Sequence, residues 1–173
     1  MSVPFGIQKG VSKNQIKVGK ETSLFNYQIL EVPRPHSYFP YVYAQITPIN
    51  GVSRITAKGD LINAGRYGIN LKNIYDELLE QLSNKYGKPG NKMNNLDNVM
   101  KSHNFIDLYR NPRLYFYAAW GAKKGLSLQN DLKFIQLEFY AADSSNGFFM
   151  LNYDYDNYRL AVEEIKNIND TAL

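Results

Sequence analysis

Few side chains in this sequence could carry acid–base or nucleophilic chemistry. There are two histidines, His36 and His103, and no cysteine. A nucleophilic triad needs a base such as histidine, and most zinc sites draw their ligands from histidine and thiolate side chains. His36 lies among prolines and His103 lies in an irregular stretch, so we expect both to be surface or turn histidines.

Carboxylate pairs are the other source of acid–base chemistry. Asp154 and Asp156 are two residues apart, and Glu163 and Glu164 are adjacent. Two carboxylates can carry glycoside hydrolysis, but a strand end and a solvated helix face are ordinary places for acids. The lysine-containing turn at residues 121–125 lacks the spacing of a phosphate-binding loop. The sequence therefore predicts a protein that is not an enzyme and that holds no metal and no cofactor.

Aromatic side chains are the unusual feature of the composition, with 14 tyrosines and 9 phenylalanines. Tyr41 and Tyr43 share one face of a predicted strand, and Arg54 and Lys58 lie on the next strand. Strand propensity explains part of this enrichment. The remainder suits protein recognition, because tyrosine combines a rigid apolar body with a polar tip. Single-stranded nucleic acid could use the same stacking, but the basic residues are dispersed, and we rank nucleic acid below protein.

Charge is distributed unevenly along the chain, whose formal net charge is +4. Residues 1–142 carry 18 Lys or Arg against 10 Asp or Glu, whereas residues 143–173 carry 2 against 6. A basic body attracts acidic partners, although no run of basic residues exceeds two. No window approaches the ~20 apolar residues of a membrane span. We expect a cytoplasmic protein, or a periplasmic one if a leader peptide has been removed. The oligomeric state is not predicted.

The clearest element that could position these residues is a helix over residues 70–89. Its apolar side chains recur at the spacing of one helical face. They are Leu71, Ile74, Tyr75, Leu78, Leu82 and Tyr86. We expect Asn70 to cap its first turn, and Gly87 followed by Pro89 to end it.

Strands are expected on both sides of this helix. The predicted strands are 27–32, 39–47, 52–58, 114–121, 133–141 and 148–155, with a short helix from Ser12 to Gly19 and a last helix over 157–170. The expected fold class is α+β, an antiparallel sheet with helices packed on one face, in a single domain over residues 1–173. Matching helix ends at residues 17–20 and 85–88 also permit pseudo-duplicated α-βββ units, with half-repeats 1–60 and 66–156. A lysine before a glycine cap is common for dipole reasons alone, so this alternative stays open.

Residues 90–113 form the least regular stretch of the sequence. Loops of this length in small domains are uncommon and are often functional. His103, Tyr109 and Arg110 from this stretch complete the predicted partner-binding residues, beside Tyr41, Tyr43, Arg54 and Lys58.

Short motifs spread along the chain carry a resemblance. They are Pro4-Phe5-Gly6-Ile7, Gly10-Val11-Ser12, Val32-Pro33-Arg34-Pro35-His36, Tyr67-Gly68 and Lys85-Tyr86-Gly87-Lys88. Over nearly the whole chain they resemble a family of small stand-alone bacterial proteins of uncharacterised function. Proteins of this sort are similar to the immunity proteins encoded beside antibacterial toxins. The resemblance implies a module that binds and neutralises a cognate bacterial toxin.

A second likeness leads to a different class of protein. Residues 10–16 and the helix-ending glycine are similar to small lipoproteins of outer-membrane assembly. This likeness implies a periplasmic or envelope-associated scaffold. The lipobox cysteine of those proteins is missing here, which speaks against a lipid anchor.

Overall fold

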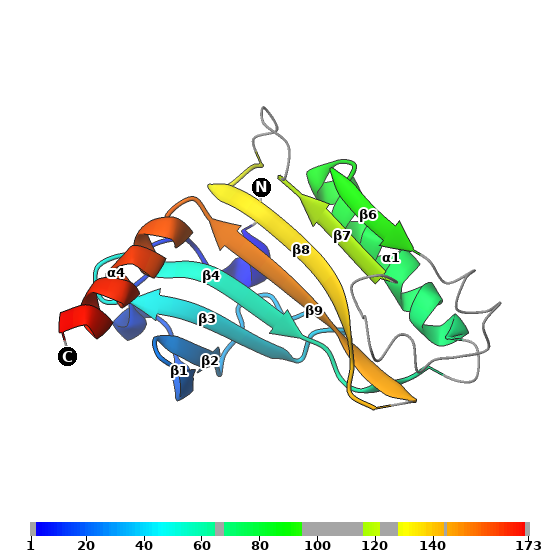
Figure 1. The fold of residues 1–173 in the computed structure, drawn as a ribbon, viewed down its shortest axis with the longest axis horizontal. Helices are drawn as coiled ribbons and strands as arrows, with labels where there is room; N and C mark the ends of the chain where they lie inside the picture. Colours follow the sequence, from blue (N-terminus) through cyan, green and yellow to red (C-terminus); the bar gives the residue numbers. More distant parts are fainter. Residues whose placement is uncertain (1–2, 65–67, 95–115, 122–127, 144, 172–173) are drawn as a thin grey trace.

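A single antiparallel sheet runs through the protein. The computed structural model describes residues 3–64, 68–94, 116–121, 128–143 and 145–171. Within them, nine strands form one sheet in the order β1-β2-β3-β4-β9-β8-β7-β6, with β5 paired to β9 (Figure 1). The strands are β1 Val18–Ser23, β2 Asn26–Ile29, β3 Tyr41–Thr47, β4 Gly51–Lys58, β5 Ile62–Asn63, β6 Asn91–Asn94, β7 Phe116–Trp120, β8 Leu132–Ala141 and β9 Asn146–Tyr155. The predicted α+β class is confirmed.

The sheet consists of two antiparallel meanders, β1 to β4 and β6 to β9. They join along β4 and β9, where Arg54 lies opposite Asp154 and Lys58 lies opposite Met150. The buried side chains of both meanders belong to one hydrophobic core. The second meander follows a full helix, whereas the first follows only a single 3-10 turn, η2 (Lys13–Gln15). Duplication of α-βββ units therefore stays a prediction.

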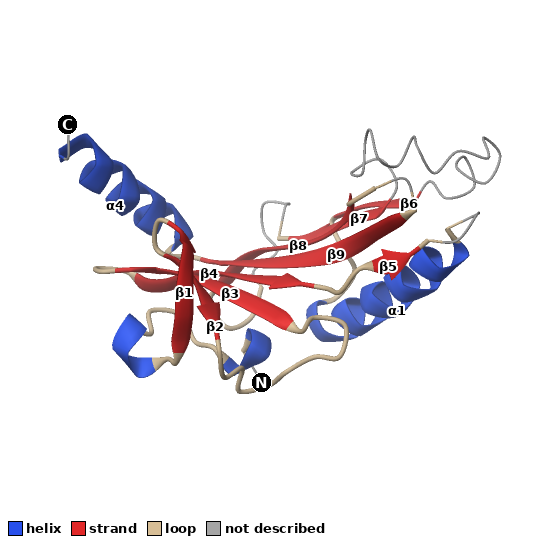
Figure 2. Cartoon of the chain, turned by 90° about the horizontal axis from the view of Figure 1, so that it is seen from below, coloured by secondary structure: helices blue, strands red, loops and turns tan. Residues whose placement is uncertain are grey.

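Helix α1 (Ile69–Tyr86) covers one face of the sheet (Figure 2). Four members of the predicted stripe are buried, and the other two are partly buried against the core. The buried four are Leu71, Tyr75, Leu78 and Leu82. Two polar groups at the contact are paired as well. The Tyr75 hydroxyl donates to the Tyr117 carbonyl at 2.8 Å, and the Trp120 indole N–H donates to the Gly87 carbonyl at 2.7 Å.

The predicted caps of two helices need correction. Gly68, and not Asn70, is the N-cap of α1, with a left-handed φ of 67° and no side-chain hydrogen bond. The Asn70 amide instead donates to the Asn63 carbonyl at 3.4 Å. The helix expected between Ser12 and Gly19 is only the 3-10 turn η2, and Gly19 belongs to β1. Ser12 and Gln15 form an S-x-x-Q capping box, in which Gln15 Oε1 accepts from the Ser12 N–H at 3.0 Å. Such a box is as compatible with one 3-10 turn as with two α-helical turns.

Helix α4 (Tyr158–Thr171) projects from the end of the sheet that is remote from α1 (Figure 2). Its position in the chain agrees with the predicted helix over 157–170. The apolar side chains of α4 are only partly covered, because Leu160 is 56% exposed and Ile168 is 36% exposed. Its buried residues are Ala161 and Glu164. Among the described residues, no helix combines the length and the apolar character needed to cross a membrane.

A 3-10 turn near the N-terminus, η1 (Pro4–Gly6), contributes to the core. It buries Phe5, whose ring meets the Tyr153 ring edge-on with centroids 6.2 Å apart.

The irregular stretch predicted over residues 90–113 is described only in part. Strand β6 accounts for residues 91–94, and residues 95–115 lie outside the described part. His103, Tyr109 and Arg110 are therefore outside it too.

Candidate functional site

The face of the sheet opposite α1 carries the predicted tyrosines. Side chains alternate between the two faces of each strand. The core face therefore takes Val42, Ala44 and Ile46 from β3, which leaves Tyr41 and Tyr43 on the opposite face. We call this opposite side the open face, since none of the described helices lies over its middle (Figure 2).

An aromatic and basic cluster lies on the open face where β3 and β9 begin and β4 ends. Tyr41 lies directly opposite Lys58, and Lys58 lies opposite Met150. The Lys58 ammonium is 4.4 Å from the centroid of the Phe148 ring, which is a cation–π distance. Tyr43 is the next open-face residue of β3. We call Tyr41, Tyr43, Lys58, Phe148 and Met150 the Tyr41 patch.

The exposure of the Tyr41 patch suits recognition. Tyr41 is 42% exposed, and the other four side chains are half-buried. The Phe148 ring is held from one side by Tyr140, with ring planes 14° apart and centroids separated by 5.9 Å. No carboxylate of the described residues forms an ion pair with Lys58. The patch therefore offers pre-positioned aromatic area and an unneutralised ammonium.

Arg54 lies on the same face but is already engaged. Its guanidinium donates twice to the Asp154 carboxylate, at 2.5 and 2.9 Å, and lies 4.0 Å from the centroid of the Tyr158 ring. The Asp154 side chain is only 11% exposed. Because Tyr158 begins α4, Arg54 ties the sheet to that helix. Arg54 therefore lies on the predicted sheet face, but it is bound to Asp154 and Tyr158 and does not belong to the Tyr41 patch.

The carboxylate pairs found in the sequence do not converge on one site. Asp154 pairs with Arg54, whereas Asp156 pairs with Lys9 at 3.0 Å. Glu163 is exposed and bonds Arg159 within its own helix at 3.2 Å. No group of three or more histidine, aspartate or glutamate side chains comes together as a metal site in the described part of the chain.

Glu164 is buried, and its carboxylate accepts from the turn between β3 and β4. The donors are the Ile49 N–H at 2.8 Å, the Asn50 N–H at 3.2 Å and the Asn50 side-chain amide at 2.7 Å. Burial alone would raise the pKa of Glu164, but the nearby Thr47 hydroxyl, followed by the Ile49 and Asn50 donors, outweighs burial and holds the pKa below its ordinary value. Glu164 is thus an anchor for α4.

A second buried acid, Glu138, was missed by sequence reasoning. It lies on the open face and is 1% exposed. Its carboxylate accepts from the Tyr140 hydroxyl at 2.7 Å and from the Gln136 amide. Gln136 and Tyr140 are two positions before and after it on the same strand face. An acid between two donors at i±2 is the sequence pattern that could have indicated this network.

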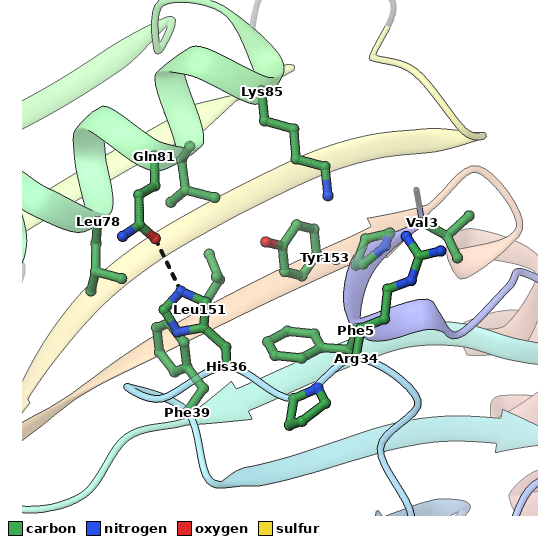
Figure 3. A pocket seen from close by; sticks show the side chains of 13 residues that line it. Val3, Phe5, Arg34, His36, Phe39, Leu78, Gln81, Lys85, Leu151 and Tyr153 are labelled. Atoms are coloured by element: carbon green, nitrogen blue, oxygen red, sulfur yellow. Dashed lines mark hydrogen bonds between the residues drawn. The ribbon is translucent and has the colours of Figure 1, made fainter. Parts of the chain in front are cut away.

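A cavity of about 260 Å³ lies on the other side of the sheet, between α1, η1 and the loop of residues 33–40 (Figure 3). It includes His36, whose Nε2–H donates to Gln81 Oε1 at 3.0 Å and whose Nδ1 accepts from the Tyr38 N–H at 3.2 Å. His36 lies in a turn closed by a bond from the Phe39 N–H to its carbonyl at 3.0 Å. This position agrees with the predicted turn histidine.

The lining of this cavity is basic and apolar. Arg34 and Lys85 line it together with His36, and no acidic residue of the described part of the chain lines it. Within that part, His36 has no carboxylate beside it in the cavity to form an acid–base pair. Sequence reasoning missed Arg34 and Lys85, because they are 51 positions apart and each had a local explanation, a proline-rich corner and a helix end.

Comparison with protein-family models, with curated proteins and with solved structures gave no match.

Proposed function

We propose that this chain is a non-enzymatic protein-binding module that docks its partner on the Tyr41 patch, and that the partner is a bacterial toxin that it neutralises. The observation that carries the proposal is the exposed Tyr41 beside a lysine that has no carboxylate partner in the described part of the chain. Tyrosine and cationic side chains in well-packed surroundings dominate the binding energy of many interfaces.

The side chains of the Tyr41 patch are also held in place before a partner binds. Phe148 is stacked on Tyr140 and covered by the Lys58 ammonium, so these side chains lose little conformational freedom on binding. Each member stands on a strand in the interior of the sheet, and β3, β4 and β9 are hydrogen-bonded neighbours. A preformed surface of this kind favours tight binding without rearrangement.

Lys58 indicates the charge of the partner. Opposite charges across an interface steer association and exclude wrong partners. Residues 1–142 carry an excess of basic side chains, as counted above, so the long-range field of the body also favours an acidic protein. We therefore expect the toxin to present a carboxylate toward Lys58 and apolar area toward Phe148. The assignment of the partner as a toxin rests on the resemblance to immunity proteins.

Co-expression with the product of the neighbouring gene tests this function. The two proteins are expected to co-purify as a stable complex, and cells that express the neighbouring product alone are expected to stop growing. Growth returns when this chain is present. Absence of both a complex and a growth rescue would contradict the proposal.

Two substitutions locate the interface within that complex. Lys58→Glu reverses the charge of the patch, and Tyr41→Ala removes its most exposed ring. We expect each to weaken binding by at least ~10-fold, as for a hot-spot loss of more than ~1.4 kcal/mol. Lys20→Glu makes the same charge change at an exposed site on β1 and serves as the matched control. Equal effects of Lys58→Glu and Lys20→Glu would show that only the overall charge matters and would refute the assigned surface.

A further inference from the structure

Two cations line the cavity beneath α1, and none of the described residues that line it is acidic. Arg34 enters it from the loop of residues 33–40, and Lys85 enters it from the last turn of α1. Figure 3 shows Lys85 extending from α1 and Arg34 extending from the loop, with the Tyr153 oxygen on the side of its ring that faces away from Arg34. Neither forms an ion pair with a carboxylate of the described residues. Burial and then the nearby charge of Arg34 lower the pKa of Lys85. The pair is therefore mutually repulsive, and an anion between the two groups would relieve the repulsion.

Tyr153 forms the wall beside this pair. Its side chain lines the same cavity, and it belongs to β9 in the middle of the sheet. Burial first, and then the charge of the neighbouring Tyr86 phenol and a hydrogen bond to it, hold the pKa of Tyr153 well above its ordinary value. Tyr153 therefore stays neutral and adds no negative charge to the cavity. A guanidinium and an ammonium together form a charge-assisted site for one small anionic group.

The rest of the cavity is apolar. Its walls include Phe5 and Phe39 from the N-terminal half, Leu78 and Leu82 from α1, and Leu151 from the sheet. All five are buried. His36 and Gln81 bond each other at 3.0 Å, so their polar atoms face one another. Sites for drug-sized ligands usually measure about 300–1,000 Å³. A cavity of about 260 Å³ suits a smaller ligand.

We propose that this cavity binds a small amphipathic monocarboxylate, with the carboxylate held by Arg34 and Lys85. The apolar body, one aromatic ring or a short hydrocarbon chain, packs against Phe5 and Leu78. An inorganic phosphate would satisfy the cations but leave the apolar walls unused. The site is separate from the proposed toxin-binding patch, because it lies on the α1 side of the sheet and the Tyr41 patch lies on the open face.

Titration of the ¹⁵N-labelled full chain with 3-phenylpropionate tests this site by NMR. We expect saturable shifts of the backbone amides in residues 34–39 and 78–85. The neutral analogue 3-phenylpropionamide and inorganic phosphate test the two halves of the ligand separately. Each is expected to bind at least ~10-fold more weakly, the factor that corresponds to one lost charge-assisted contact. Equal binding of the amide, equal binding of phosphate, or no saturable shift with 3-phenylpropionate would overturn the proposal.

Charge-removing variants test the residues of the site. Arg34→Gln and Lys85→Gln are each expected to weaken 3-phenylpropionate binding at least ~10-fold. Lys88→Gln removes an exposed cation just beyond the end of α1 and is expected to change affinity less than twofold. Both cavity residues are exposed enough for their variants to keep the fold, which unchanged amide spectra outside the cavity would verify. A Lys88→Gln loss as large as that of Lys85→Gln would show nonspecific attraction and refute the site.

A carboxylate of this kind can come from a free metabolite or from the C-terminus of a peptide. The tripeptide Gly-Gly-Phe and its C-terminal amide distinguish the two sources. Tighter binding of 3-phenylpropionate than of the tripeptide supports a free acid. Tighter binding of the tripeptide, lost on amidation, supports a chain terminus held by the same two cations.

Discussion

Replacing Glu164 with glutamine isolates the anchor that holds α4 against the sheet. One carboxylate oxygen accepts from Ile49 and the other accepts two bonds from Asn50. A glutamine keeps one acceptor oxygen and turns an NH₂ group toward donors. Hydrogen bonds to charged groups contribute about 1.5–3 kcal/mol each. Ile49 is 85% exposed, so water reaches this turn and can solvate the freed donors. We therefore expect a loss of about 2 kcal/mol, near the lower end of the range.

The same substitution has a defined pH dependence. The pKa of Glu164 in the folded protein is lower than the ordinary carboxyl pKa that it has in the unfolded chain. At pH values between these two pKa values, the unfolded state binds more protons than the folded state, so stability rises with pH there. The ionised carboxylate therefore stabilises the fold fully at pH values above its ordinary pKa. This stabilisation is lost as the pH falls through the lower folded value. The stability curves of wild type and Glu164→Gln are therefore expected to converge in acid.

Urea unfolding at pH 7 and at a series of acidic pH values measures both effects. In a thermal scan at neutral pH, the same loss of about 2 kcal/mol is expected to lower Tm by about 4–8 °C for a chain of this size. Glu163→Gln is the matched control, because Glu163 is the exposed neighbour in the same helix, and its expected cost is under about 0.5 kcal/mol. Equal losses for the two variants, or a Glu164→Gln difference that persists unchanged into acid, would refute the anchor.

Two further substitutions test the packing of the sheet. Tyr75→Phe removes the hydrogen bond to the Tyr117 carbonyl and is expected to cost about 1–2 kcal/mol in urea unfolding; an unchanged stability would show that water replaces this bond. Gly51→Ala places a Cβ 2.3 Å from the Gly10 carbonyl oxygen at a φ of 62°, whereas Gly10→Ala at a φ of 74° meets nothing within 4 Å. Left-handed backbone alone costs about 1–2 kcal/mol. Thermal unfolding should therefore show a larger loss for Gly51→Ala, and equal losses would rule out the steric contact.

Local periodicity predicts the elements of this fold well. Alternation along β3 predicts the buried Val42, Ala44 and Ile46, because one side of that strand faces the core. The stripe of α1 is predicted for the same reason, since Tyr75 and Leu78 recur at helical spacing on the buried side. Each of these patterns is decided within a few residues of chain.

Long-range placement could not be predicted in the same way. The pairing of β4 with β9 joins the two meanders, and no sequence pattern within either strand identifies the other as its partner. Glu138 alternates like a solvent-facing residue, and only its donors in three dimensions make burial tolerable. Arg34 and Lys85 meet because the loop of residues 33–40 folds under α1. The exposure of apolar side chains on α4 could not be predicted from periodicity either, because an apolar stripe does not indicate how much of it packs against the rest of the protein.

The central claim is that the open face, through the Tyr41 patch, is the surface that binds the partner. Mapping of amide and side-chain NMR shifts on the ¹⁵N,¹³C-labelled chain, with and without the co-purified partner, tests it most directly. The claim predicts that the largest changes fall on Tyr41, Lys58 and Phe148, with the α1 side of the sheet nearly unchanged. Changes confined to α4 or to the cavity beneath α1, with the Tyr41 patch unaffected, would contradict it.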